Sequence, residues 1–382
     1  MRVRVYNLPM RMARARVGLT GLVLLGGCAE DFEMPPEVAS SKYIDFHTDA
    51  DASVICMDDR LAREDRFIER TAEVLGAPVP GGRIDYVFDP RWEGSDPWIC
   101  PVGAQACYRS REKDDLSVVV ARTLTQHHEL VHAVEGQALG QGHPTLIEGL
   151  AEYLGTTNLS LNWEGFPERF KNMLDASPKP SEYRVAMHFV GSLIERYGVE
   201  KYRALRERMP EDAGLEEFAE VFAEEIGVSL DDALTAMDGA SVYAVDEVEG
   251  CDEDAPVLAW TEPGVIDATI EAVCGDPWFY GGGFSIGDAG FYGHHVVEVA
   301  EAGMYELTVG GVGAGPVPLR AGVVGCSFDV QGTGVLSIDG HAGTGSLGVG
   351  RHTLGIAFPQ RDEARGEATV LLTYLGPVPA EE

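Results

Sequence analysis

The chain has 382 residues, of which 62 are acidic and 29 are basic, so its formal net charge at pH 7 is −33. A chain this acidic lacks the basic footprint that nucleic-acid binding requires, which excludes that class of partner. We interpret the charge as a solvated surface that keeps the protein soluble, with a preference for basic peptides as the alternative.

The first 28 residues have the composition of an export signal. Residues 1–16 contain five arginines and no acidic residue, and residues 17–27 form an apolar stretch of eleven residues, which is too short to span a bilayer. The stretch ends in Leu-Gly-Gly-Cys28, which resembles a bacterial lipoprotein signal box. This resemblance implies cleavage before Cys28 and a lipid on its sulfur. The mature protein would then be anchored to the cell membrane or outer membrane, facing the periplasm or the exterior; a plain secretory signal is the alternative.

Composition divides the following residues into a linker and a first domain. Residues 29–41 are rich in Pro, Ser and acidic residues, which predicts a flexible tether. Residues 42–245 predict an α+β domain with a small mixed sheet. Its first part combines a helix near 58–75 with strands at 83–88 and 116–121, and from 124 to about 238 the pattern is helical.

One helix of this domain is expected over residues 123–140. Thr123 or Thr125 can cap its start, apolar residues recur along it, and Gly140 is a stop signal. No proline interrupts the segment, so the helix supplies a regular frame for the motif that it carries.

That motif is His-Glu-Leu-Val-His at residues 128–132. On a helix, positions i and i+4 lie on one face about one turn apart, so His128 and His132 can bind one metal ion. Glu129 is rotated by roughly 100° from His128, where it can act as a general base towards a water molecule at the metal. The arrangement is that of zinc metallopeptidases.

A second pair of residues completes the predicted site. Two histidines and a water leave tetrahedral zinc one protein ligand short. Glu148 follows His132 by sixteen residues, and Glu152 lies one helical turn further in an otherwise apolar segment, where carboxylates are costly to bury without a purpose. We expect Glu148 to bind the metal and Glu152 to accept a hydrogen bond from a ligand histidine, fixing its tautomer. A solvated helix face is the alternative for Glu148.

The two motifs together resemble the gluzincin clan of metallopeptidases, in particular the bacterial peptidase-MA-like proteins related to the thermolysin fold. The resemblance covers residues 42–240. It implies one catalytic Zn²⁺ held by His128, His132 and Glu148, with Glu129 polarising the water, and peptides or proteins as substrates. The stretch between the motifs is short, so any lid between the two helices is small.

A related family is excluded by two residues of the first helix. Metzincins have a glycine and a third histidine at the positions that Glu135 and Ala138 occupy here. A third histidine ligand within that extension is therefore not expected.

Further candidates lie near the motifs in the sequence. A helix is expected over 181–198, and its Tyr183 could donate a hydrogen bond to the developing oxyanion, although an aromatic residue at a helix start more often only packs. His143 and His188 lack the spacing to replace Glu148 as a ligand. His127 points away from the metal face and is interpreted as a bystander.

Residues 250–382 predict a separate all-β domain. This part holds 26 of the 46 glycines of the chain, and short β runs separated by glycine turns indicate a β-sandwich. The stretch from Phe291-Tyr-Gly-His-His to Ala302-Gly-Met-Tyr305 is loosely similar to the accessory β-domains that follow bacterial secreted peptidases. The expected strands are 296–299, 305–309, 318–324, 353–358 and 368–374.

The cysteine count agrees with export. Six cysteines remain when Cys28 is set aside, and an even number in an oxidising compartment suggests disulfides. Six cysteines allow fifteen pairings; the pairs expected are Cys100–Cys107, Cys274–Cys326 and Cys56–Cys251.

The sequence therefore predicts an exported, lipid-anchored zinc peptidase with an accessory β-sandwich. A catalytically silent, peptidase-like binding module with a structural zinc is the alternative. In a third reading, the C-terminal domain binds the target while the peptidase processes something local.

Overall fold

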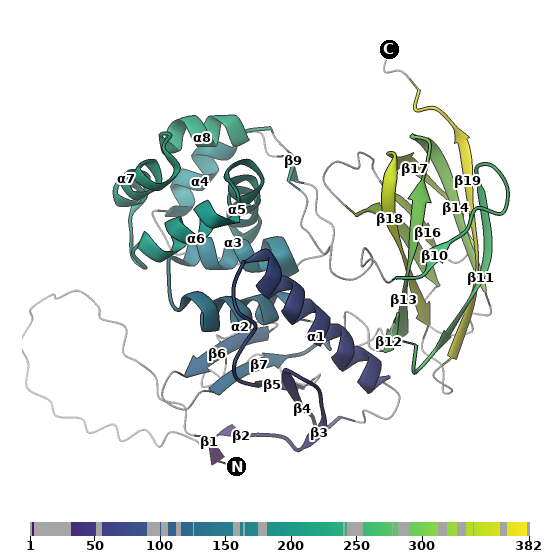
Figure 1. Ribbon diagram of the computed structural model, residues 1–382, viewed down its shortest axis with the longest axis horizontal. Helices are drawn as coiled ribbons and strands as arrows, with labels where there is room; N and C mark the ends of the chain where they lie inside the picture. Colours follow the sequence, from purple (N-terminus) through teal and green to yellow (C-terminus); the bar gives the residue numbers. More distant parts are fainter. Residues whose placement is uncertain are drawn as a thin grey trace, which may run out of the picture.

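Two bodies of different architecture make up this mixed α+β protein (Figure 1), a computed structural model of the 382-residue chain. A helical body with a small sheet comes first, and two packed β-sheets follow it. The structure describes residues 2–3, 32–50, 56–89, 100, 106–111, 116–124, 126–155, 161–162, 165–174, 182–239, 241–242, 255–276, 278–281, 290–311, 319–326, 334–338, 340–359 and 365–379.

A mixed five-stranded sheet forms the floor of the first body. Its spatial order is β3-β4-β5-β7-β6, in which β4, β5 and β7 are parallel and the two edge strands are antiparallel to their neighbours. The apolar central strands have buried side chains on both faces, as expected of parallel strands. The bounds are β3 Glu37–Ser40, β4 Ile44–His47, β5 Ile84–Phe88, β6 Ala106–Arg111 and β7 Leu116–Ala121.

Eight helices occur among the described residues, all in the first body. α1 and α2 pack on one face of the sheet, and the remaining helices gather on the far side of α2 (Figure 1). One hydrophobic core joins that sheet face to the helices. The bounds are α1 Met57–Val74, α2 His127–Leu139, α3 Pro144–Gly155, α4 Phe166–Leu174, α5 Tyr183–Tyr197, α6 Val199–Arg208, α7 Leu215–Ile226 and α8 Leu230–Met237.

The second body is the predicted β-sandwich. Its two sheets are ordered β10-β13-β18-β15-β16, with β12 beside β13, and β11-β19-β14-β17, and a single apolar core is shared by side chains of both. All five expected strands lie within or overlap observed ones. The bounds are β10 Val257–Leu258, β11 Val265–Val273, β12 Phe279–Gly281, β13 Gly290–Val299, β14 Gly303–Gly311, β15 Arg320–Gly325, β16 Val335–Ile338, β17 Gly343–Leu347, β18 Gly350–Pro359 and β19 Arg365–Gly376.

Two short antiparallel ribbons complete the strands, β1 (Arg2–Val3) with β2 (Phe32–Glu33) and β8 (Leu161–Asn162) with β9 (Ser241–Val242). The prediction of a tether over residues 29–41 was wrong for its second half. There β3 pairs with β4 and becomes an edge strand of the sheet. The composition of the segment predicts flexibility, but β4 supplies hydrogen-bond partners for its backbone. The predicted signal segment and Cys28 lie almost entirely outside the described residues.

The disulfides differ in part from those expected. Cys56 is bonded to Cys274, with their Cα atoms 5.1 Å apart, so the predicted pairs Cys274–Cys326 and Cys56–Cys251 were wrong. Cys326 also belongs to a disulfide, while residue 251 lies outside the described part of the chain. The error arose from assuming that cysteines of one domain pair with each other. The short-range pair Cys100–Cys107 is present as expected.

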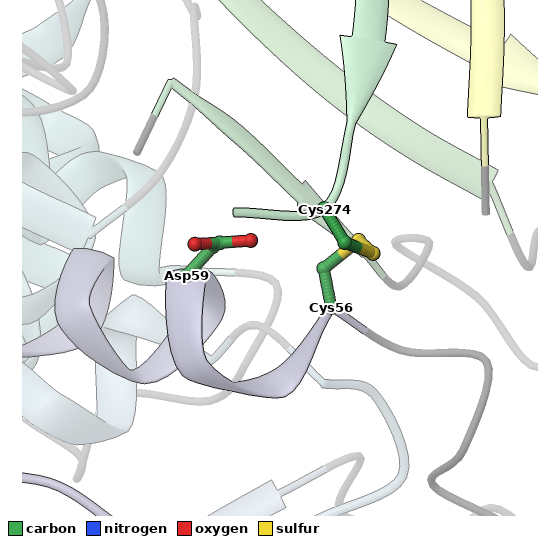
Figure 2. Close-up of side chains that lie close together, drawn as sticks. All are labelled: Cys56, Asp59 and Cys274. Atoms are coloured by element: carbon green, nitrogen blue, oxygen red, sulfur yellow. A yellow bond between two sulfur atoms is a disulfide. The ribbon is translucent and has the colours of Figure 1, made fainter. Parts of the chain in front are cut away.

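The Cys56–Cys274 bond joins the start of α1 to the turn after β11, and it therefore ties the two bodies together (Figure 2). Asp59 Oδ2 accepts the backbone N–H of Gly275 over 2.6 Å beside the bond. The sulfur atoms of Cys56 and Cys274 and a carboxylate oxygen of Asp59 lie within 4.8 Å of one another. Because the two sulfurs are bonded to each other, they are not thiolate ligands, and this group is a covalent link rather than a metal centre.

Among the helices of the described residues, none has both the length and the apolar character needed to cross a membrane.

Candidate metal centre

The first motif lies on α2 as predicted. His128 Nε2 and His132 Nε2 are 3.1 Å apart, and the two rings meet edge to face with centroids 4.7 Å apart. Gly140 ends the helix as expected, with φ of 70°. The start differs from the prediction, because the helix begins at His127 and the side chain of Gln126 donates to the Thr123 hydroxyl instead of capping a helix amide.

The second motif lies on α3 and faces the first. Glu148 Oε2 is 3.2 Å from His128 Nε2 and 3.5 Å from His132 Nε2. One ligand atom from each residue lies within 4.8 Å of the other two, so this group could hold a metal ion. The three side chains retain 11–23% of their surface exposed, which leaves the group accessible from solvent.

Glu152, one turn beyond Glu148 on α3, contacts the outer nitrogen of the first histidine. Its Oε2 is 3.1 Å from His128 Nδ1, as predicted for a residue that fixes the histidine tautomer. Burial alone would lower the pKa of His128. The hydrogen bonds to Glu148 and Glu152 outweigh it and raise that pKa to about 10 in the metal-free protein.

Glu129 and Tyr183 border the same group. Glu129 is buried, with 8% of its surface exposed, and its charge raises the pKa of both His128 and Tyr183. The Tyr183 ring stacks on the His128 ring at a centroid distance of 5.8 Å, and the Glu148 carboxylate lies near enough to raise the pKa of the Tyr183 hydroxyl. Burial and the nearby carboxylates raise the pKa of Tyr183, so its hydroxyl keeps its proton. The simple packing role considered for Tyr183 is therefore only part of its contacts.

Two glycines of α3 allow the helices of the site to approach closely. A Cβ atom at Gly149 would lie 2.6 Å from the carbonyl oxygen of Ala186 on α5, and one at Gly155 would lie 2.4 Å from the backbone nitrogen of His128 on α2. Real Cβ atoms essentially never come within 3.0 Å of such atoms. Glycine at these two positions is what lets α3 carry Glu148 and Glu152 up to the histidines.

The far end of α2 is held by a buried ion pair. Glu135 Oε1 accepts from Arg206 Nε over 2.9 Å and from the Tyr202 hydroxyl over 2.8 Å. The Arg206 guanidinium also donates to the carbonyl oxygens of Gly140 and Gln141 over 2.7 and 2.8 Å. Carbonyls at the end of a helix need such partners, so Arg206 of α6 both pairs with α2 and closes it.

The start of α2 is held by residues that sequence reasoning missed. His127 does point away from the metal face, as predicted, but it is not a bystander. Its Nε2 is 2.9 Å from Glu64 Oε2 of α1, and the Phe67 ring stacks on it at 3.8 Å. The available signal was the placement of Arg60, Arg63 and Glu64 on the apolar face of α1.

The other two histidines near the motifs are structural. His143 lies beside the start of α3, where its Nδ1 accepts the Thr145 amide and its Nε2 contacts the carbonyl oxygen of Ala213. His188 Nε2 contacts the carbonyl oxygen of Met237 at the end of α8 over 3.0 Å. Neither is part of the metal-ligating group, in agreement with the expectation from their spacing.

Comparison with known proteins adds little to this geometry. No protein-family model matches the chain, and no curated protein matches it. Among solved structures, the chain is similar to an aminopeptidase A of Legionella pneumophila in complex with aspartic acid, with 8% identity and a TM-score of 0.28. The match covers 92% of this chain and 38% of that one, and a TM-score of this size carries no argument about fold or activity.

Proposed function

We propose that this chain is a zinc-dependent peptidase of the gluzincin kind. The observation that carries the proposal is the convergence of His128, His132 and Glu148 from two helices, with Glu152 on the outer nitrogen of His128. The motifs on α2 and α3 provide the resemblance to that clan, and the contacts in space support it.

The donor set fits zinc. When His128 Nδ1 donates to Glu152, its Nε2 presents a lone pair to His132 Nε2 and to Glu148 Oε2, both within 3.2 Å. Three electron-pair donors so close together suit a cation between them, and two imidazoles with one carboxylate are the ligands of a catalytic zinc that keeps one position open. When bound, zinc lowers the pKa of a coordinated water and polarises the carbonyl group of the substrate.

The protein residues then divide the remaining work. Glu129 takes the proton of the attacking water and passes it to the nitrogen of the leaving amine. Tyr183, which keeps its proton, donates a hydrogen bond to the carbonyl oxygen as negative charge develops there. Glu152 holds the His128 ring in the orientation and tautomer that the metal requires.

The substrate would lie extended along a sheet edge. The strand that precedes α2, β7, lies inside the sheet, and the edge on that side is the antiparallel strand β6. Tyr108 of β6 packs over Gly136, one turn beyond His132 on α2. An edge strand beside the metal-ligating helix suits β-strand addition of a peptide. A peptide inhibitor bound away from β6 in a crystal would refute this part.

The test combines metal analysis with a peptide-library digest. Purified protein should contain one zinc per chain and cleave peptides, and Glu129→Gln should keep the zinc but lose about 10²–10⁴-fold in kcat. Glu220→Gln, on the exposed surface of α7, is the matched control and should retain activity. Wild-type protein that binds zinc and leaves a broad library intact would favour the silent binding module instead.

We also propose that the protein is exported and lipid-anchored. The arginine-rich start, the apolar stretch and Leu-Gly-Gly-Cys28 support this, and disulfides such as Cys56–Cys274 and Cys100–Cys107 suit an oxidising compartment. Labelling with a radioactive fatty acid should modify the wild type but not Cys28→Ala. If the wild-type protein were exported but unlabelled and soluble, the lipid anchor would be refuted and a plain secretory signal would be the remaining explanation.

A further inference from the structure

The first turn of α2 carries two of the residues on which the proposed activity depends, His128 and Glu129. Helix ends fray because their first four amides have no partner within the helix. Here the N-cap residue, Gln126, directs its side chain to Thr123. The position of this turn must therefore be set by contacts from other elements.

One set of contacts comes from α1. Glu64 Oε2 lies 2.9 Å from His127 Nε2, and Glu64 Oε1 accepts from Arg60 over 3.0 Å and from Arg63 over 3.2 Å. Each of these four side chains has at most 4% of its surface exposed. On the same helix, Phe67 stacks nearly parallel to the His127 ring, at an interplanar angle of 11°.

The other set comes from α3. At Gly155 an added Cβ would lie 2.4 Å from His128 N and 2.6 Å from the His127 carbonyl carbon. The backbone of the first turn thus packs against α3, while the His127 side chain contacts Glu64 and Phe67 of α1. The turn is held between these two helices, and α3 also carries Glu148 and Glu152.

Stability alone is a weak explanation for the cluster around Glu64. Burying charged groups is costly, and a well-packed apolar cluster of similar volume is often at least as stable. A hydrogen bond from a charged group does supply a fixed direction. The direction fixed here is that of the residue immediately before the first metal-ligating histidine.

We propose that Glu64 and His127 are positioning residues, which lock the first turn of α2 so that His128 and Glu129 face Glu148 in a fixed geometry. Neither touches a reacting atom, and both act through the backbone of α2. Only the activity measurement in the test rests on the proposed peptidase function. Local hydrogen exchange of the metal-free protein tests the positioning independently.

The test compares two substitutions of His127 with a control. His127→Phe keeps the ring stack on Phe67 but removes the donor to Glu64, whereas the amide nitrogen of His127→Gln can restore that donor. His188→Phe is the matched control, because it also removes one hydrogen bond from a buried histidine in the same body. If His127→Phe folds poorly, His127→Leu takes its place with the same expected results, because it also removes the donor to Glu64.

In full-length, metal-free protein, we expect His127→Phe to accelerate amide exchange within residues 127–132 by tenfold or more, with His127→Gln close to wild type. In the zinc-loaded protein, His127→Phe should lower kcat by about ten- to a hundredfold, with KM changed less than about twofold. His188→Phe should lower Tm without either effect. The proposal would be overturned if His127→Phe accelerated amide exchange evenly over the whole first body. It would also be overturned if His127→Phe lowered kcat no more than His188→Phe does. Local acceleration without turnover by the wild type would support the positioning and refute the peptidase.

Discussion

A single methyl group added at Gly149 should loosen the site, because α3 packs against α5 at this glycine with no room for a Cβ atom. The Cβ of Gly149→Ala would meet the Ala186 carbonyl oxygen and Val190 Cγ2, both at 2.6 Å. Ordinary contact begins near 3.4 Å, so the two helices must separate by roughly 0.8 Å at this point. That movement carries Glu148 away from the Tyr183 hydroxyl of α5.

Two opposing terms set the size of the effect on stability. Overpacking of this kind costs about 1–3 kcal/mol, and alanine in place of glycine inside a helix returns about 1 kcal/mol. We expect a net loss of about 0–2 kcal/mol, or a Tm lower by up to roughly 8 °C for a body of this size. Zinc affinity should fall as well, because Glu148 is adjacent to residue 149 and would move with it relative to the two histidines.

Thermal unfolding and a zinc titration of Gly149→Ala measure both effects. Gly81→Ala serves as the control, because Gly81 is exposed outside the helices, nothing lies within 4 Å of a Cβ there, and its φ is outside the left-handed region; it should change Tm by no more than a degree or two. If Gly149→Ala were more stable than the wild type and bound zinc equally well, close packing of α3 on α5 would not be what positions Glu148.

Three further predictions concern other parts of the account. Glu152→Gln should weaken zinc binding about 10–100-fold with little change in Tm, as measured by competition with a chelator; unchanged affinity would remove Glu152 from the site. Burial raises the pKa of Glu64, but His127 and two arginines outweigh it and lower that pKa to about 2, so Glu64 contributes stability that is fully present above about pH 4.5 and is lost as pH falls towards 2. Acid unfolding of Glu64→Gln should lack this loss, on the order of 3 kcal/mol, and an acid limb as steep as that of the wild type would contradict it. Replacing Cys56 and Cys274 by serine should lower the free energy of unfolding by about 2–5 kcal/mol, and an unchanged denaturation midpoint would show that the bond does not hold the two bodies together.

The metal-ligating group could be predicted because it depends on local geometry. His128 and His132, like Glu148 and Glu152, are spaced by one turn, and a helix places such pairs on one face wherever it lies in the fold. The sequence separation between the motifs is short, so α2 and α3 pack as neighbours. The strands of the sandwich were predicted on the same basis, from apolar runs between glycine turns.

What escaped prediction depends on contacts between distant segments. Glu64 meets His127 across 63 residues, and Cys56 meets Cys274 across 218. Neither of these two pairs can be predicted from sequence spacing. Both form because α1 packs against α2 and also against the second body. The strand β3 was mistaken for a tether for a similar reason, since only its pairing with β4 makes it a strand.

The central claim is that two imidazoles and one carboxylate of this chain bind a single zinc. X-ray absorption at the zinc edge of the loaded protein measures the ligands directly. We expect nitrogen and oxygen neighbours at about 2.0–2.2 Å, with the multiple-scattering signature of two histidines, and loss of half of that signature in His132→Ala. A first shell of sulfur at about 2.3 Å, or a spectrum unchanged in His132→Ala, would contradict the account.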